Sequence, residues 1–238
     1  MYICILSLSF MKQKITIAID GFSSTGKSTI AKQLAKNLGY IYVDTGAMYR
    51  AVTLYAMQQN YISDSHFNPE ELVTDLHKIS LSFKFNKELG FAEMYLNNTN
   101  VEATIRTIEV SRLVSEVATI SEVRKKLVSE QQEMGKNKGI VMDGRDIGTV
   151  VFKNAELKLF MTASADKRAT RRYKELLDRG DKVNYAEILH NVQERDRIDS
   201  TREDSPLVRA DDAIEFDNSD MGLKEQFDRI MSLVNMRL

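Results

Sequence analysis

Cysteine is nearly absent from this sequence of 238 residues, which holds only Cys4. A single thiol excludes a disulfide framework and a cysteine-rich metal centre, and it fits a reducing, cytoplasmic setting. An excess of basic residues is missing too, because 33 lysines and arginines face 34 acidic residues, for a net charge of −1. Proteins that bind nucleic acid or membrane surfaces through charge need a marked basic excess, so the composition argues against both partners.

A long hydrophobic run is also lacking. The first ten residues, MYICILSLSF, are apolar, but a spanning helix needs about 20 apolar residues, and a signal peptide needs a basic start. We therefore predict that residues 1–13 are an extension, or that Met11 is the natural start. The hydrophobic content of 43% and charged content of 28% are those of a soluble globular protein. The length suits one domain with small insertions.

Strand and helix patterns alternate at the start of the chain. The β-branched run Lys14–Asp20 is typical of a buried strand, and Ser28–Leu38 has helical spacing. Tyr40–Asp44 predicts a second strand, and Thr45 is well placed to cap a helix that runs to about Gln59. This order predicts an α/β fold of three layers, with a central parallel sheet of about five strands between helices.

The middle of the chain departs from that alternation. Ile79–Phe85 and Phe91–Asn97 are apolar or aromatic runs that flank a turn, which predicts a β-hairpin. We expect an inserted subdomain over residues 63–106, within a core formed by residues 14–62 and 107–238. The other elements that we predict are helices over Ile108–Thr119, Ser121–Met134, Asp166–Arg179, Tyr185–Ser200 and Gly222–Met236, and strands over Gly139–Asp143, Leu157–Thr162 and Ala213–Asp217.

A phosphate-binding loop lies between the first strand and the first helix. Gly21–Ser28 (GFSSTGKS) matches the pattern G-x-x-x-x-G-K-[ST]. Glycines let backbone N–H groups surround phosphate oxygens, and the following helix presents its positive end. Lys27 would reach the β- and γ-phosphates, and the Ser28 hydroxyl would bind Mg²⁺. A plain glycine turn is the alternative, but the flanking strand and helix favour a P-loop NTPase fold that binds ATP.

The P-loop does not say what is done with the nucleotide. A switch GTPase would also carry the elements D-x-x-G and N-K-x-D. Asp143–Asp146 lacks the glycine of the first element, and Asn137–Ile140 lacks the aspartate of the second. A GTPase is therefore disfavoured, and a binding protein without transfer activity stays as an alternative to a kinase.

Charged residues gather after the other predicted strands. Asp44–Arg50 (DTGAMYR) and Gly139–Val151 both end a strand at the carboxyl edge of the sheet, where ligands bind in open α/β folds. The Arg50 guanidinium suits a phosphate. Arginines also recur on helix faces between Arg168 and Arg209, as phosphoryl transfer requires. Capped helices and ordinary salt bridges would give the same pattern.

Four segments together resemble one family. GFSSTGKST, DTGAMYRA, MDGRDIGTVVF and ERDRIDSTREDSPL follow one another as in bacterial cytidylate (CMP) kinases, from Met11 onward. The resemblance implies a nucleoside monophosphate kinase that uses ATP and Mg²⁺ to phosphorylate CMP or dCMP. It also implies a cytoplasmic monomer with no nucleic-acid or membrane partner. Residues 63–106 would be the NMP-binding subdomain, and about residues 163–184 a helical lid.

The resemblance also implies roles for individual residues. Ten of them would bind ATP: Gly21, Phe22, Ser23, Ser24, Thr25, Gly26, Lys27, Ser28, Thr29 and Arg171. The catalytic residues would be Lys27, Arg145, Arg168 and Arg172. Ser28 would bind Mg²⁺ directly and Asp143 through water. The CMP site would comprise Thr45 and Tyr49, the phosphate ligands Arg50, Arg145 and Arg202, the ribose ligands Arg195 and Asp199, and the cytosine readers Ser115, Arg124 and Asp146.

Two positions in the P-loop depart from the family. Relatives often carry proline and glycine where this chain has Phe22 and Ser24, so the backbone at Ser24 must tolerate a side chain. Another P-loop kinase, acting on UMP, AMP or a metabolite such as shikimate, stays an alternative. The carboxylate of Asp146 separates these alternatives, because it can accept the exocyclic amine of cytosine, whereas uracil presents an oxygen there.

Overall fold

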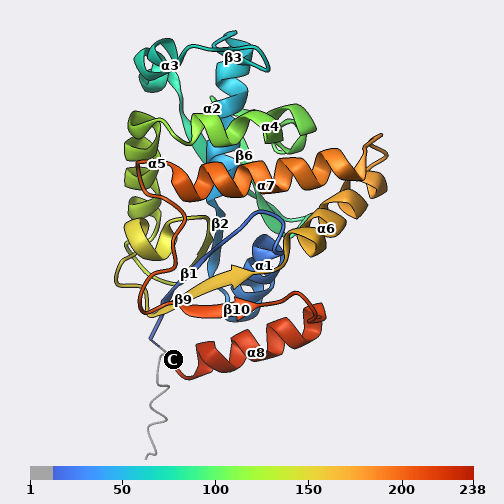
Figure 1. Cartoon of the computed structure of the whole chain (residues 1–238). Helices are drawn as coiled ribbons and strands as arrows, with labels where there is room; N and C mark the ends of the chain where they lie inside the picture. The colour runs from blue at the N-terminus through green and yellow to red at the C-terminus, as the bar shows by residue number, and fades with distance from the viewer. Residues whose placement is uncertain (1–12) are drawn as a thin grey trace, which may run out of the picture.

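The computed structural model of the protein describes residues 13–238. The extension predicted over residues 1–13 therefore lies, except for its last residue, outside the described residues. A five-stranded parallel sheet occupies the centre (Figure 1), in the order β10-β9-β1-β8-β2. Its strands are β1 (Thr16–Gly21), β2 (Ile41–Asp44), β8 (Ile140–Asp143), β9 (Leu157–Thr162) and β10 (Ile214–Asp217). The predicted α/β fold is confirmed.

Helices cover both faces of this sheet because side chains of a strand alternate between faces. Ile17 and Ile19 are buried in a core that includes residues of α1 (Lys27–Leu38) and α8 (Leu223–Asn235). Ala18 between them belongs to the opposite core, which is also the larger one. Full burial of one such isoleucine contributes roughly 1.5–3 kcal/mol. The second core takes most of its helical residues from α2 (Thr45–Gln58), α4 (Ile108–Val117) and α5 (Ser121–Met134).

The predicted hairpin is present in the inserted region. β5 (Leu81–Asn86) pairs antiparallel with β6 (Phe91–Leu96), and β6 pairs with the short β7 (Thr99–Asn100). Our sequence reading missed several smaller elements here, most of them only two or three residues long and therefore too short to show periodicity. They are β3 (Ile62–Ser63), β4 (His66–Phe67), α3 (Pro69–Asp75) and the single turns of 3₁₀-helix at Leu76–Lys78 and Thr104–Arg106.

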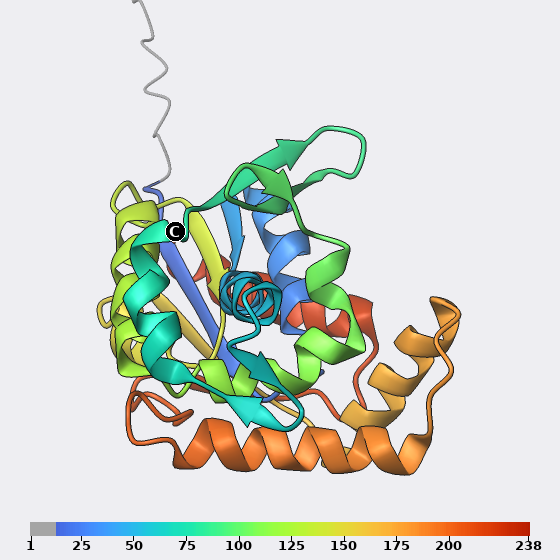
Figure 2. The same cartoon turned by 90° about the horizontal axis from the view of Figure 1, so that it is seen from above.

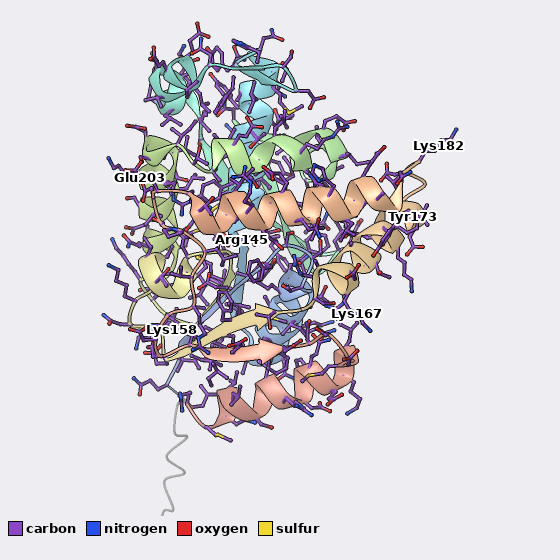
Figure 3. The ribbon with its side chains drawn as sticks, viewed as in Figure 1. Arg145, Lys158, Lys167, Tyr173, Lys182 and Glu203 are labelled. Carbon is purple, nitrogen blue, oxygen red and sulfur yellow. The ribbon has the colours of Figure 1, made fainter. Side chains whose placement is uncertain are left out.

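Two helices lie on the side of the carboxyl ends of the central strands. α6 (Ala165–Asp178) and α7 (Tyr185–Thr201) are joined by a short turn and form an arm. Viewed from above, this arm and the β5–β6 hairpin lie at opposite sides of the molecule (Figure 2). Arg145 lies beside α7 near the middle of the molecule, whereas Lys182 lies at the outer end of the arm (Figure 3). None of the helices within residues 13–238 is long and apolar enough to cross a membrane.

Two local features differ from our expectations. Thr45 does not cap α2, because the carboxylate of Asp44 caps it instead and accepts a hydrogen bond of 2.9 Å from the Ala47 N–H. The Thr45 hydroxyl is engaged elsewhere, as it donates to the carbonyl of Asp143 on the neighbouring strand at 2.8 Å. The second feature is a turn of π-helix, Ile147–Val151, which follows β8 and which we did not predict.

Candidate active site

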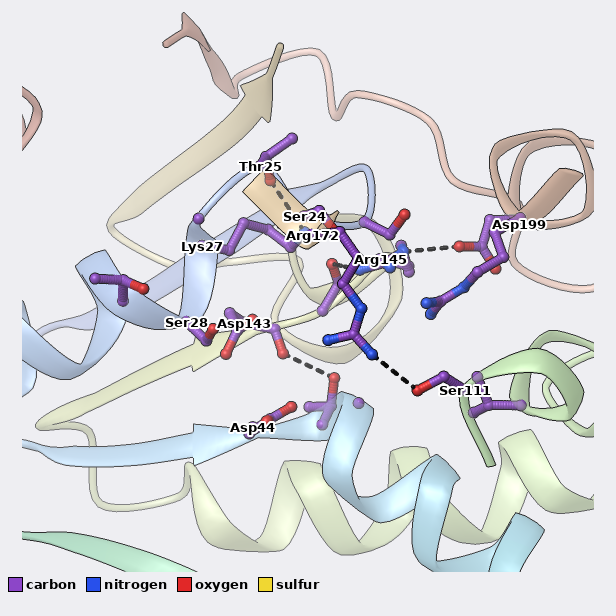
Figure 4. A pocket seen from close by; sticks show the side chains of 18 of the residues that line it. Ser24, Thr25, Lys27, Ser28, Asp44, Ser111, Asp143, Arg145, Arg172 and Asp199 are labelled. Atoms are coloured by element: carbon purple, nitrogen blue, oxygen red, sulfur yellow. Dashed lines mark hydrogen bonds and ion pairs between the residues drawn. The ribbon is translucent and has the colours of Figure 1, made fainter. Parts of the chain in front are cut away.

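A cleft of about 640 Å³ opens at the carboxyl ends of the central strands. The P-loop, the start of α2, the loop after β8 and the helices α4 and α7 supply its walls (Figure 4). Most of the predicted site residues line it: Ser23, Ser24, Thr25, Gly26, Lys27, Ser28, Thr29, Thr45, Tyr49, Arg50, Ser115, Arg124, Asp143, Arg145, Asp146, Arg171, Arg172, Arg195, Asp199 and Arg202.

The P-loop has the backbone that its sequence indicates. Gly21 has φ 141°, and a Cβ there would lie 2.0 Å from the carbonyl oxygen of Met161, so no side chain fits. Gly26, at the N-cap of α1, has φ 90°. Ser24 has φ 58°, in the left-handed region where relatives would place glycine. The expectation that the backbone at Ser24 must tolerate a side chain is confirmed, at a cost of about 1–2 kcal/mol.

The side chain of Lys27 folds back onto the P-loop. Its Nζ donates to the carbonyl of Phe22 at 2.5 Å and to the Thr25 hydroxyl at 3.3 Å. Burial lowers the pKa of this ammonium well below its usual value, and the nearby Arg145 acts in the same direction. A cation that is so poorly solvated gains strongly from an anionic ligand.

Two carboxylates lie side by side at the ends of β2 and β8, where Asp44 and Asp143 are register partners. Burial raises the pKa of Asp143 to about 6, and the charge of Asp44 adds to the rise. Burial also opposes ionisation of Asp44, but Arg106 and Arg50 outweigh it and hold the pKa of that carboxyl well below its usual range. Asp143 also accepts a hydrogen bond of 2.8 Å from the Tyr42 hydroxyl, and a cation bound beside it would favour its ionised form.

The oxygen atoms beside the P-loop suit a Mg²⁺ ion that is bound together with a nucleotide, and not a metal ion that is held by protein side chains alone. Ser28 and Asp143 offer oxygen ligands at the cleft, which Mg²⁺ prefers. Within residues 13–238 no group of three or more His, Cys, Asp or Glu side chains is placed to hold a metal. Mg²⁺ commonly uses one or two protein oxygens together with substrate phosphates and water, so the residues present suit an ion that arrives with a nucleotide.

Arginines surround the middle of the cleft. Burial lowers the pKa of Arg195 to about 10, with the like charge of Arg145 acting in the same direction. Burial likewise lowers the pKa of Arg50 to about 10. The buried Nε atoms of both arginines have no hydrogen-bond partner among the described residues. Buried donors of this kind are normally satisfied, so these two N–H groups indicate a site for an anion such as a phosphate.

A buried ion pair also lines the cleft. The guanidinium of Arg124 donates to the carboxylate of Asp146, and the two side chains are only 2% and 5% exposed. Arg124 also donates to the carbonyl of Ala118 at 3.1 Å and lies 5.5 Å from the centre of the Tyr49 ring. Nearby, Arg145 donates to Asp199 of α7 at 2.8 Å. Fixed donors and acceptors of this kind can read a flat polar ring.

Three predicted residues do not line the cleft: Gly21, Phe22 and Arg168. Our reading of the sequence missed several residues that do, including Asp44, Arg106, Ser111, Glu175 and the segment Met221–Leu223. A signal existed for two of these. Asp44 belongs to the quoted DTGAMYR segment, and Met221–Leu223 follows the carboxyl end of the last strand. Ser111 and Glu175 have no such mark, because only tertiary packing brings α4 and α6 to the cleft.

The strand order, with a phosphate loop between β1 and α1, defines the class as a P-loop α/β protein that binds nucleotides. Several arginines line the same cleft, a grouping that is typical of phosphoryl-transfer sites. The cytidylate kinase family model matches residues 17–236, and the chain belongs to that family.

Curated relatives agree with this assignment. A protein of Flavobacterium johnsoniae named cytidylate kinase is 68% identical, over 94% of this chain and 97% of its own length. The cytidylate kinase of Flavobacterium psychrophilum is 66% identical, over 94% of this chain and 99% of its own length. That of Parabacteroides distasonis is 59% identical, over 90% and 93% of the two chains.

Proposed function

We propose that the protein transfers the γ-phosphoryl group of ATP to CMP or dCMP, giving ADP and CDP or dCDP. One observation carries this proposal. One cleft is lined by the P-loop, by the buried Arg124–Asp146 pair and by several other arginines. Membership of the cytidylate kinase family supports the same reaction.

The donor nucleotide would bind at the P-loop. Backbone N–H groups between Gly21 and Thr29 would hold its phosphates, Lys27 would neutralise them, and Arg171 would approach from α6. Ser28 would hold Mg²⁺ directly and Asp143 through water. When bound, the ion would screen the phosphate charge and orient the phosphoryl oxygens. Because burial raises the pKa of Asp143 to about 6, its ionised form is only moderately favoured at neutral pH, and a bound cation would stabilise that form.

The acceptor would bind toward α4 and α7. Arg50, Arg145 and Arg202 would hold the phosphate of CMP, and Arg195 and Asp199 its ribose. Ser115, Arg124 and Asp146 would read the cytosine edge, because the Asp146 carboxylate can accept the exocyclic amine. Thr45 and Tyr49 would complete the walls. The unpartnered Nε atom of Arg50 supports this placement of the acceptor phosphate, and that of Arg195 leaves a donor for the ribose.

Catalysis then needs no covalent enzyme intermediate. An oxygen of the CMP phosphate attacks the γ-phosphorus directly, and the enzyme positions the two anions and stabilises the spreading charge. Lys27, Arg145 and Arg172 would supply that charge. Arg172 donates to Ser111 of α4 at 3.4 Å, so it already bridges the arm and the acceptor side (Figure 4).

Parts of the chain would move around a fixed core. We propose that residues 14–62 and 107–238 form the core, that residues 63–106 are the acceptor-binding subdomain, and that about residues 163–184 are a lid. Closing the lid would exclude water, so that the phosphoryl group reaches CMP and not water. We further propose a cytoplasmic monomer that acts on small substrates, without nucleic acid or membrane. The single cysteine and the balanced charge support this setting.

An ADP-release assay tests the proposal. Purified protein with Mg·ATP is offered CMP, dCMP, UMP, AMP or shikimate in turn, and ADP is measured with each. We expect CMP or dCMP to give the fastest release. Release that is no faster with CMP than without an acceptor would refute the kinase, and a preference for AMP or shikimate would refute the acceptor.

A further inference from the structure

Arg168 is the one predicted catalytic arginine that does not line the cleft. It lies in the first turn of α6, its side chain is 4% exposed, and most of its guanidinium N–H groups have partners within the protein. Two parallel hydrogen bonds of 2.9 and 2.6 Å join it to both oxygens of Asp196 on α7. Its Nε donates to the carbonyl of Ala163 at 2.9 Å. With a further contact to the P-loop described below, four of its five N–H groups have partners within the protein, and the residue does not line the cleft, so it is not placed to contact a phosphate there.

The remaining contacts of Arg168 are with the P-loop. Its Nη1 donates to the carbonyl of Ser23 at 3.4 Å, and its guanidinium lies 5.2 Å from the centre of the Phe22 ring. Phe22 in turn packs edge to face on Phe160 of β9, with ring centres 6.1 Å apart. The outer side of the P-loop is therefore packed against the guanidinium of Arg168.

Holding a carbonyl on the outer side fixes an N–H group on the inner side. The peptide unit is planar and trans, so its C=O and N–H point in opposite directions. Arg168 holds the Ser23 carbonyl outward, which turns the Ser24 N–H toward the cleft that Ser24 lines. Arg171 and Asn218 do the same for the carbonyl of Thr25, at 3.3 and 2.7 Å. These N–H groups would bind phosphate oxygens.

We propose that Arg168, locked by Asp196, is a positioning residue that sets the P-loop N–H groups for ATP. The proposal rests on the ATP-dependent function proposed above, and it replaces direct contact of Arg168 with the reacting phosphates. Because Arg168 begins α6 and Asp196 lies in α7, the pair also ties the root of the arm to the donor loop. Asp196 thereby gains a role that its sequence did not suggest.

Asp196→Asn distinguishes positioning from direct phosphate binding. If Arg168 positions the loop, loss of its charged partner raises KM for ATP about ten-fold or more, as expected for a lost hydrogen bond between charged groups. Arg168→Lys does the same, because an ammonium cannot span two carboxylate oxygens and a carbonyl. If Arg168 binds phosphate, Asp196→Asn frees it, and KM for ATP stays unchanged or falls. That result would overturn the proposal.

The acceptor side serves as an internal reference. We expect KM for CMP to stay within about two-fold of wild type in both variants, and the double variant to be no worse than either single one, because the two residues act as a unit. An equal rise of both KM values, or effects that add, would overturn the proposal in favour of general destabilisation. Arg197→Lys is the matched control, since Arg197 pairs with Glu194 on the exposed side of α7.

Binding of a non-hydrolysable ATP analogue to the full-length protein gives a second measure. Calorimetry should show the same ten-fold weakening in Asp196→Asn and Arg168→Lys, with CMP binding retained. If the wild-type protein binds the analogue but releases no ADP with CMP, the proposed function fails while the positioning role is still measured. Analogue binding of wild-type strength in Asp196→Asn would refute the positioning role alone.

Discussion

The two ends of the cleft are built in opposite ways. At the donor end, where we propose that ATP binds, the consecutive residues of one loop would offer their backbone N–H groups, and side chains such as Arg168 and Asn218 bind the carbonyls of that loop. At the acceptor end, side chains from α2, α4, α5, α7 and the loop after β8 converge on one place. The difference teaches that a backbone site is encoded by adjacent residues, whereas a side-chain site exists only after the helices have packed.

Electrostatics differ as well. The acceptor end holds its charges in pairs, such as Arg124 with Asp146 and Arg145 with Asp199. Lys27 at the donor end contacts a carbonyl and a hydroxyl and forms no ion pair with the described residues. Removal of one member of such a pair therefore leaves its partner buried without a counter-charge. Removal of Lys27 leaves no ion-pair partner behind and takes away only the positive charge that would face the ligand.

Lys27→Ala tests the donor end and should have the largest effect. We expect the rate of ADP release with CMP to fall by about 10²–10³, because a preorganised cation is lost from the transferring phosphate. Steady-state kinetics would measure the change. Lys32→Ala is the control, since Lys32 lies further along α1 with its Nζ 4.1 Å from the Phe91 ring. A Lys27→Ala enzyme with full activity would remove the P-loop from the mechanism.

Asp20 connects the strand before the P-loop to the segment after β8, and its burial predicts a pH dependence of stability. This carboxyl group near the end of β1 accepts hydrogen bonds of 2.8 and 2.7 Å from the N–H groups of Ile147 and Gly148, in the π-helical turn after β8. Burial raises its pKa to about 7, from 3.8 in the unfolded chain. Between these values the folded protein keeps a proton that the unfolded chain has lost, so stability falls as pH rises.

The expected contribution of Asp20 is a loss of about 2–3 kcal/mol in the free energy of unfolding between pH 5 and pH 8. Urea unfolding at several pH values would measure it. In Asp20→Asn this component should vanish. Asp217→Asn, at the exposed end of β10, should leave it in place. The same pH dependence in wild type and Asp20→Asn would show that the carboxyl is ionised in the folded protein.

Asp146→Asn tests the base-reading part of the acceptor end. We expect the preference for CMP over UMP to fall about ten-fold, because the amide can no longer act as a pure acceptor toward the cytosine amine. The ratio of kcat/KM for the two nucleotides measures this. Asp199→Asn is the matched comparison, since the loss of a contact to the ribose should weaken the binding of both substrates equally. Unchanged discrimination in Asp146→Asn would contradict the proposed cytosine contact.

Ser24→Gly probes the strain in the donor loop and should have the smallest effect. Relief of the left-handed backbone, worth about 1–2 kcal/mol, slightly exceeds the entropy cost of glycine, about 0.5–1 kcal/mol. We expect a gain of about 0.5 kcal/mol in the free energy of unfolding, measured by urea. Ser23→Gly should instead destabilise, because Ser23 has no positive φ to relieve. Equal losses in both variants would argue against strain at Ser24.

Sequence patterns located the long elements well. The central strands and the long helices lie within a few residues of their predicted bounds, because runs such as Leu157–Thr162 carry a clear pattern of buried residues. Prediction failed where a competing contact decided the outcome. The Thr45 hydroxyl turned to the Asp143 carbonyl and left the cap of α2 to Asp44. It also failed at β3, β4 and the π-helix, which are too short or too irregular to leave a periodic signal.

Adjacent residues by themselves determined the phosphate loop and its place between a strand and a helix, since these follow from local sequence pattern and backbone geometry. The need for glycine at Gly21 also depends on tertiary packing, because a Cβ there would meet the carbonyl oxygen of Met161 in β9. Tertiary structure alone decided which partner each arginine contacts. Arg168 and Arg172 are four residues apart on one helix, yet one is locked to Asp196 behind the P-loop and the other reaches Ser111 across the cleft. Spacing gives the face of a helix, but only packing gives each guanidinium its partner.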